Sequence, residues 1–283
     1  MGNFGAHIDE GITFFLLALW WMYNIYKNYI QSVEEKRPYR SYCSYYVMLK
    51  GRRLPAETIM KIIFPIGGLL TEVLSTDSFL EKNGNFRNIG KFHHISIFAL
   101  FILHGVSDFL ETHRFSAIKG MKYFTFSVAF IWYGVAFYFH CMPDLGKPAL
   151  ENTMHRLLVP FLIITGMAVM FEFGFRNSII PQIVRCYLVL CAGEWIILTS
   201  FVLFLPTPFP GRRRNPAWDQ DEISNVRFME AAVGFMLVAN IAFMIISYTL
   251  MALYMKYARV CFKNRETLKY RYTPLENLEK GEF

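Results

Sequence analysis

Five of the seven histidines stand at or beside the ends of long apolar stretches, where side chains from different helices could meet. They are His7, His93, His94, His140 and His155, and Glu72 lies near the end of another such stretch. Imidazole is the commonest protein ligand of transition metals, and carboxylates complete such sites. These six residues therefore predict a candidate site for zinc or another transition metal. The alternative is that histidines simply suit a polar membrane interface. His93 and His94 are about 100° apart on a helix and cannot both point at one centre.

A second set of ionisable residues lies inside the apolar stretches. On a helix, His93, His104, Asp108 and Glu111 would share one face, because their spacings are close to whole turns. Ionisable groups are costly in hydrocarbon, so this face should point into a bundle. The pattern predicts either a path for protons or ions or, as the favoured interpretation, a set of hydrogen bonds between helices.

Two further glutamates occur in the apolar stretches. Glu194 lies near the middle of one, where we expect it to be protonated or paired with His104. Glu172 precedes Arg176 by four residues, the spacing of an ion pair along a helix, so a structural clamp is expected there.

The composition indicates what kind of protein positions these residues. Of 283 residues, 54% are hydrophobic and only 18% charged, whereas a soluble domain carries about 25% charge. This composition argues against an ordinary soluble enzyme, and we expect an all-α, polytopic membrane protein with a seven-transmembrane-helix bundle. The apolar stretches are Gly11–Tyr26, Glu57–Leu74, Phe92–Leu110, Met121–Phe139, Leu157–Phe173, Ile183–Leu205 and Phe228–Tyr254. Within the second stretch, Pro65 predicts a kink.

Basic residues predict the orientation of these spans. Of the 29 lysines and arginines, 19 lie in or beside the segments that follow the first, third, fifth and seventh stretches. Because cytoplasmic loops carry the excess of Lys and Arg, the N-terminus should be outside or lumenal and the C-terminus cytoplasmic. The candidate metal site then lies at the outer face. The net charge of +7 is explained by these loops, so nucleic acid is not an expected partner.

We expect two parts, a transmembrane domain over residues 1–255 and a basic, mobile cytoplasmic tail over residues 256–283. The tail contains Tyr272-Thr273-Pro274-Leu275, which has the form of a tyrosine-based sorting signal. Sorting adaptors that bind Tyr272 and Leu275 are therefore expected partners, beside the lipid bilayer. The chain is predicted to be an integral, multi-pass membrane protein, and its sequence does not distinguish endomembranes from the plasma membrane. Five cysteines without metal-site spacing are expected to be free thiols.

Several short motifs resemble those of the transmembrane protein 45 family. They are Met1-Gly2-Asn3-Phe4, His7, Gly11, Phe14-Phe15, Leu19-Trp20-Trp21, His93-His94 with Gly105 and Asp108, His155 with Leu157-Leu158, Glu172, Arg176-Asn177, Gly193 with Trp195, and Pro216-Ala217-Trp218-Asp219. The resemblance covers about residues 1–254. It implies a seven-span membrane protein of poorly defined molecular function, connected with intracellular membranes and vesicle trafficking. His104, Glu194 and Met236 depart from the family pattern, and the tail motif is not carried over from it.

The function that these features favour is non-enzymatic, in membrane trafficking or scaffolding, because no catalytic spacing stands out. Two alternatives remain open. One is a metal-dependent membrane enzyme with its site at the outer face, and the other is a transporter of ions or small molecules that uses the ionisable residues of the bundle.

Overall fold

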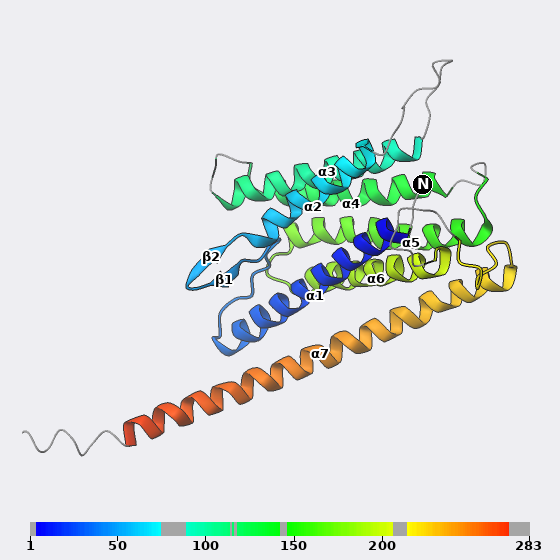
Figure 1. Ribbon diagram of the computed structural model, residues 1–283. Coiled ribbons are helices and arrows are strands. Elements are labelled where there is room, and N and C mark those ends of the chain that lie inside the picture. The colour runs from blue at the N-terminus through cyan, green and yellow to red at the C-terminus, as the bar shows by residue number, and fades with distance from the viewer. Residues whose placement is uncertain are drawn as a thin grey trace, which may run out of the picture. The chain divides into compact units, whose positions relative to one another are not determined.

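Seven helices and one small hairpin make up the described part of the chain (Figure 1). The structure, a computed structural model, describes residues 4–74, 89–113, 115, 118–141, 146–205 and 214–271, and of residues 89 and 260–271 only the backbone. The elements are α1 Phe4–Glu34, β1 Val47–Leu49, β2 Arg52–Leu54, α2 Ala56–Leu74, α3 Ile89–Thr112, α4 Met121–His140, α5 Ala149–Gly174, α6 Ile180–Leu203 and α7 Ile223–Arg271.

Each predicted apolar stretch falls on one of these helices, so the all-α prediction is confirmed in outline. The helix α2 continues through Pro65 to Leu74, and α5 likewise contains Pro160. The hairpin was not predicted. Its turn residues Lys50 and Gly51 both have positive φ, of 48° and 78°, which is the conformation of a tight two-residue hairpin turn.

Four helices in the described part of the chain are long and apolar enough to cross a membrane. They are Gly90–Thr112 of α3, Ala149–Gly174 of α5, Ile180–Leu203 of α6 and Ile223–Arg259 of α7. The helices α1 and α4 are rich in Trp and Tyr, which have a low mean hydropathy but a large apolar surface. The helix α2 contains the three charged residues Glu57, Lys61 and Glu72. The protein is therefore an α-helical membrane protein with at least these four candidate spans.

Helices α2 to α6 pack in an order that follows the chain, and α1 packs against α6 while its aromatic side chains also contact α4. Neighbouring pairs are α2 with α3, α3 with α4, α4 with α5, α5 with α6, and α6 with α1. Side chains at the centre are largely aromatic. The largest fully buried ones include Trp21, Trp195, Tyr123, Tyr133 and Phe126.

Glycines allow the closest helix contact. A Cβ on Gly193 would lie 2.6 Å from the backbone nitrogen of Phe15, and one on Gly11 would lie 2.8 Å from that of Ile197. Only a residue without a side chain fits between two backbones this close, so these glycines fix the contact between α1 and α6.

Residues Met1–Asn240 and Ile241–Phe283 form two compact units. The second unit consists, where it is described, of the remainder of α7 as far as Arg271. The expected start of the tail, at residue 256, therefore lies within a helix rather than at its end. Tyr272 and Leu275 lie outside the described residues.

Candidate functional site

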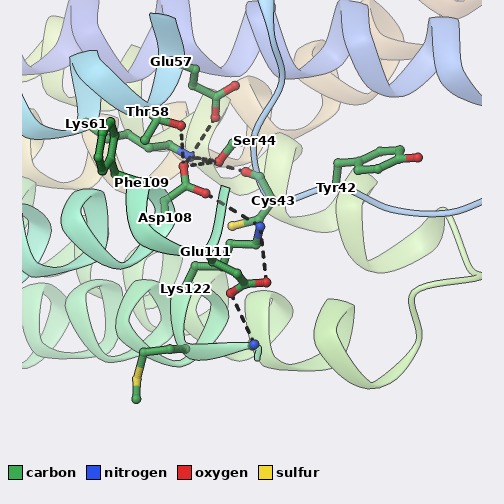
Figure 2. A network of polar contacts seen from close by, with 12 residues as sticks. Tyr42, Cys43, Ser44, Glu57, Thr58, Lys61, Asp108, Phe109, Glu111 and Lys122 are labelled. Carbon is green, nitrogen blue, oxygen red and sulfur yellow. Dashed lines mark hydrogen bonds and ion pairs between the residues drawn. The ribbon is translucent and has the colours of Figure 1, made fainter. Parts of the chain in front are cut away.

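Buried charged residues gather where the segment between α1 and α2 meets the bundle. We call Ser44, Glu57, Thr58, Lys61, Asp108, Glu111 and Lys122 the polar core; Figure 2 shows their contacts. They come from that segment and from α2, α3 and α4. Asp108 was noticed in the sequence as an ionisable residue within an apolar stretch, but its contact with Lys61 could not be predicted.

Lys61 is the central cation of the polar core. Its amino group lies 2.7 Å from Glu57 Oε1 and 3.8 Å from Asp108 Oδ2, and it donates a hydrogen bond of 2.8 Å to Ser44 Oγ. Its ammonium group also lies over the rings of Trp21 and Phe126. With two carboxylates beside it, Lys61 is held as a cation, so it is not a base for activating Ser44.

Asp108 joins three elements at one carboxylate. Its Oδ2 accepts hydrogen bonds from Ser44 Oγ at 2.5 Å and from Thr58 Oγ1 at 2.9 Å. Its Oδ1 lies 3.9 Å from Lys122 Nζ, which is also 3.5 Å from Glu111 Oε1. The side chain of Asp108 is completely buried. Such a group is costly unless neighbouring donors and cations compensate it. Here two hydroxyl groups bond Oδ2, and Lys61 and Lys122 lie at 3.8 and 3.9 Å from the carboxylate.

The carboxylate of Glu57 accepts most of its hydrogen bonds from residues outside its own helix. It accepts hydrogen bonds of 2.9 Å from both indole groups of Trp20 and Trp21 and one of 2.8 Å from the backbone N–H of Tyr45. This residue was assigned no role from the sequence. The signal that could have found it is its position four residues before Lys61 in an apolar stretch.

A second buried ion pair lies between α5 and α6. Arg185 Nε is 2.9 Å from Glu172 Oε2, and neither side chain is exposed. The guanidinium also stacks on Trp21 at 4.3 Å. The predicted pair of Glu172 with Arg176 is therefore wrong, since the bundle brings Arg185 to Glu172 from another helix. Arg176 instead donates to the Ser41 carbonyl oxygen at 3.1 Å.

These charged residues hold the backbone of the segment that follows α1. We call Tyr39–Tyr45 the strap. The carbonyl oxygen of Cys43 accepts hydrogen bonds from Lys61 at 3.3 Å and Arg185 at 3.4 Å. That of Tyr42 accepts from Gln182 at 2.7 Å, and the N–H of Ser41 donates to the Arg176 carbonyl at 2.7 Å. The strap therefore closes this end of the helix bundle.

Three side chains of the strap, Tyr39, Ser41 and Cys43, are buried with its backbone. Tyr39 donates a hydrogen bond to Gln182, and Tyr45 accepts one from the same residue at 3.0 Å. Burial raises the pKa of the Cys43 thiol to about 12, and the nearby carboxylate of Asp108 raises it too, against the opposing effect of Lys61. A thiol in this state is a weak nucleophile. The Cys43 thiol of the strap is thus buried and held in its unreactive, protonated form.

The predicted histidine site lies at the ends of α1, α3, α4 and α5 that the strap does not contact. We call His7, His155, His140 and His94 the histidine row. Neighbouring rings in it have centroids 5.6, 5.8 and 5.5 Å apart. His7 Nε2 and His155 Nε2 are 3.4 Å apart, and Glu72 lies 2.8 Å from His94 Nδ1. His93 is not part of the row, because its ring lies against Phe139.

The row is extended rather than gathered about one point. Within the described residues, no group of three or more His, Cys, Asp or Glu side chains could hold a metal ion. The donor atoms thus do not fit a zinc site, which needs three or four ligands around one centre. Two rings have one nitrogen fixed by an oxygen acceptor, His155 by the Glu151 carbonyl at 2.7 Å and His94 by Glu72.

The remaining predicted residues find different partners from those expected. His104 is fully buried, stacks on Phe126 at 4.0 Å and has its Nδ1 at 3.1 Å from the Lys122 carbonyl oxygen. Glu194 accepts a hydrogen bond of 2.7 Å from Asn240. The predicted pair of Glu194 with His104 is therefore wrong. The two residues lie on α6 and α3, which are not neighbours in the helix order.

The fold, its apolar helices and its buried ionic groups define an α-helical membrane protein. A family model described as a family of unknown function, DUF716, matches residues 119–249. That range contains α4, α5, α6 and the first part of α7, and with them the Glu172–Arg185 pair and two rings of the histidine row.

Proposed function

We propose that the chain is a seven-span membrane protein of the transmembrane protein 45 kind, with its N-terminus outside or lumenal and its C-terminus cytoplasmic. The DUF716 match over residues 119–249 supports this, because that family comprises proteins like transmembrane protein 45. The order of helix neighbours supports it as well: consecutive helices from α2 to α6 pack side by side, as spans joined by short connections do. The strap then lies at the cytoplasmic end and the histidine row at the outer end.

For its activity, we propose a non-enzymatic role in membrane trafficking or scaffolding. The observation that carries this proposal is that the charged residues inside the bundle pair with one another. Lys61 is paired with Glu57, Lys122 with Asp108 and Glu111, and Arg185 with Glu172. A catalytic centre or an ion path needs a charged group that meets substrate or solvent. Here these groups instead connect helices to one another and to the strap, which gives a rigid cytoplasmic end.

The orientation is tested by accessibility of the two termini in sealed membranes. Tags at Met1 and Phe283 should react with an impermeant reagent from opposite sides, because an odd number of spans separates them. Access to both tags from the same side would contradict the seven-span proposal.

The trafficking role is tested by proximity labelling from a ligase fused to the C-terminus. Full-length protein should label a defined set of cytoplasmic trafficking proteins, and deletion of residues 266–283 should abolish this labelling. The double substitution Tyr272→Ala with Leu275→Ala separates adaptor binding from other effects of the tail. A labelling pattern that equals that of an unrelated membrane protein, and that the deletion leaves unchanged, would refute the role.

The alternatives have less support. A metal-dependent enzyme would need ligands that converge, and the described residues offer no such group. A transporter would use Asp108 and Glu194, but Asp108 is occupied by Ser44, Thr58 and Lys122, and Glu194 is bonded to Asn240. Flux through reconstituted protein that Asp108→Asn abolishes would favour transport over the proposal.

A further inference from the structure

The hairpin formed by β1 and β2 exposes apolar side chains at the end of the bundle. Met48 is 61% exposed, Leu49 55% and Leu54 38%. The strands have three residues each, paired as Val47 with Leu54 and Leu49 with Arg52 on one face. A two-stranded hairpin of this size has little stability of its own in water. Exposed apolar groups beside polar ones mark sites that contact another molecule or a membrane.

The hairpin is firmly attached at both of its ends. On one side, the backbone N–H of Tyr45 is bonded to Glu57 and the hydroxyl of Ser44 to Asp108. On the other side, α2 begins at Ala56, and its first turn is closed by the bond from Ile59 N to Pro55 O. Figure 1 shows the hairpin continuing outward from the start of α2. It is therefore presented in a fixed place rather than on a free loop.

The charge of this segment identifies what it fits. From Lys36 to Ala56 the chain contains six basic residues and no acidic one. Three of them, Lys50, Arg52 and Arg53, belong to the hairpin and are exposed. A surface that combines apolar side chains with Lys and Arg matches the interface of a bilayer with anionic lipids, where the former enter the acyl boundary and the latter meet phosphate groups.

The connection of the hairpin to the helices places it beside such a surface. It lies between the end of α1 and the start of α2, both of which are spans under the proposed function, on which this inference rests. We infer that the β1–β2 hairpin is a lipid-contact element that binds anionic headgroups of the membrane in which the protein sits. On one face of the hairpin, Leu49 and Leu54 supply the apolar contact and Arg52 meets the phosphates. On the opposite face, Met48 and Arg53 make the same two kinds of contact, and Lys50 adds a charge at the turn.

Hydrogen exchange of the full-length protein in nanodiscs tests this inference. The protein is compared in phosphatidylcholine alone and in phosphatidylcholine mixed with phosphatidylserine. Amides of residues 46–55 should exchange several-fold more slowly in the mixed lipid. In the double variant Arg52→Gln with Arg53→Gln the difference should disappear, because each basic side chain near an anionic surface is worth about fivefold in binding.

A matched control removes two exposed basic residues elsewhere, by Arg156→Gln with Arg227→Gln. This variant should keep the full effect of phosphatidylserine. A second test variant, Met48→Ser with Leu49→Ser, should speed exchange of the hairpin in both lipids while α2 and α3 stay protected. Equal exchange in the two lipids, or an effect of phosphatidylserine that survives in the Arg52 and Arg53 variant, would overturn the inference.

The hydrogen-exchange result does not depend on how the protein is oriented in the cell, because both leaflets of a nanodisc have the same composition. Accessibility of the termini and proximity labelling therefore report on the proposed function, whereas hydrogen exchange reports on the hairpin. If the hairpin fails to respond while the termini react from opposite sides, only the lipid-contact inference is lost.

Discussion

Glu172 of α5 and Arg185 of α6 form an ion pair of 2.9 Å in which neither side chain has any exposed surface. The same guanidinium stacks on Trp21 of α1 and donates to the carbonyl oxygens of Cys43 and Tyr42 in the strap. One buried arginine therefore connects two helices that are adjacent in sequence to a helix and a segment that are more than 140 residues away.

Removing one member of this ion pair should lower the stability of the protein far more than replacing both members with apolar residues. Glu172→Gln or Arg185→Gln leaves an uncompensated buried charge, so each should lower the free energy of unfolding by about 3–5 kcal/mol. The double variant Glu172→Leu with Arg185→Met should lose clearly less than the sum of the two. Unfolding of the purified protein in detergent, followed by tryptophan fluorescence, measures these differences.

The exposed pair of Arg156 and Glu230 is the matched control. Its atoms lie 3.7 Å apart, and its side chains are 63% and 47% exposed. Replacing both with Gln should change the free energy of unfolding by about 0–1 kcal/mol. If the single variants of Glu172 and Arg185 are as mild as this control, the buried pair is not the structural centre described above.

Asp108→Asn should release the strap. The change removes the negative charge that Ser44, Thr58, Lys61 and Lys122 share. Hydrogen bonds to a charged group contribute about 1.5–3 kcal/mol, so amides of the strap should exchange hydrogen about 10- to 100-fold faster.

Ser107→Ala is the control for this change, because Ser107 precedes Asp108 and bonds only the carbonyl oxygen of its own helix at Leu103 among the contacts of the described residues. This variant should leave the strap as protected as the wild type. A strap that exchanges equally in Asp108→Asn and in Ser107→Ala would show that Asp108 does not hold it.

The thiol of Cys43 should resist alkylation in the folded protein. Burial raises its pKa to about 12, so at pH 8 almost none of it is the reactive thiolate. In the unfolded chain the pKa returns to about 8.5, and alkylation should become fast. Mass spectrometry after a short exposure to iodoacetamide, with and without denaturant, measures this contrast.

Asp108→Asn should also expose Cys43 to the reagent, since it frees the strap. Equal labelling of native and denatured protein at Cys43 would contradict the burial of the strap.

The approach of α1 to α6 should tolerate no side chain at Gly193. A methyl group there would lie 2.6 Å from the backbone nitrogen of Phe15, and overpacking of this kind costs about 1–3 kcal/mol. Gly234→Ala is the control, because nothing lies within 4 Å of a Cβ at that position and alanine favours a helix over glycine. The midpoint of unfolding should fall for Gly193→Ala and stay equal or rise for Gly234→Ala. A midpoint that falls for Gly234→Ala but not for Gly193→Ala would mean that α1 and α6 are not held in contact at Gly193.

Several features could be predicted from the sequence because they depend on local pattern. The seven apolar stretches follow from hydropathy alone, and each corresponds to a helix. The inward face of α3 follows from helical periodicity, which placed His104 and Asp108 on one side, and both are fully buried. The separation of His93 from His94 follows from the angle between adjacent residues on a helix, and only His94 belongs to the histidine row.

Partners across helices could not be predicted in the same way. The spacing of Glu172 and Arg176 fits an ion pair along one helix, but the bundle offers Glu172 the buried guanidinium of Arg185. Glu194 is bonded to Asn240 rather than to His104 because α7 supplies a donor at that point. In both cases a contact between distant segments, decided by packing, replaced the one that local spacing suggested.

The sequence by itself determined that this is a helical membrane protein, since the proportion of apolar residues and their run lengths depend on composition along the chain. Only the tertiary structure decided that the strap closes one end of the bundle through Lys61, Asp108 and Arg185. Buried charges must find partners, but which ones they find depends on how helices from distant parts of the chain pack, and no local pattern carries that information.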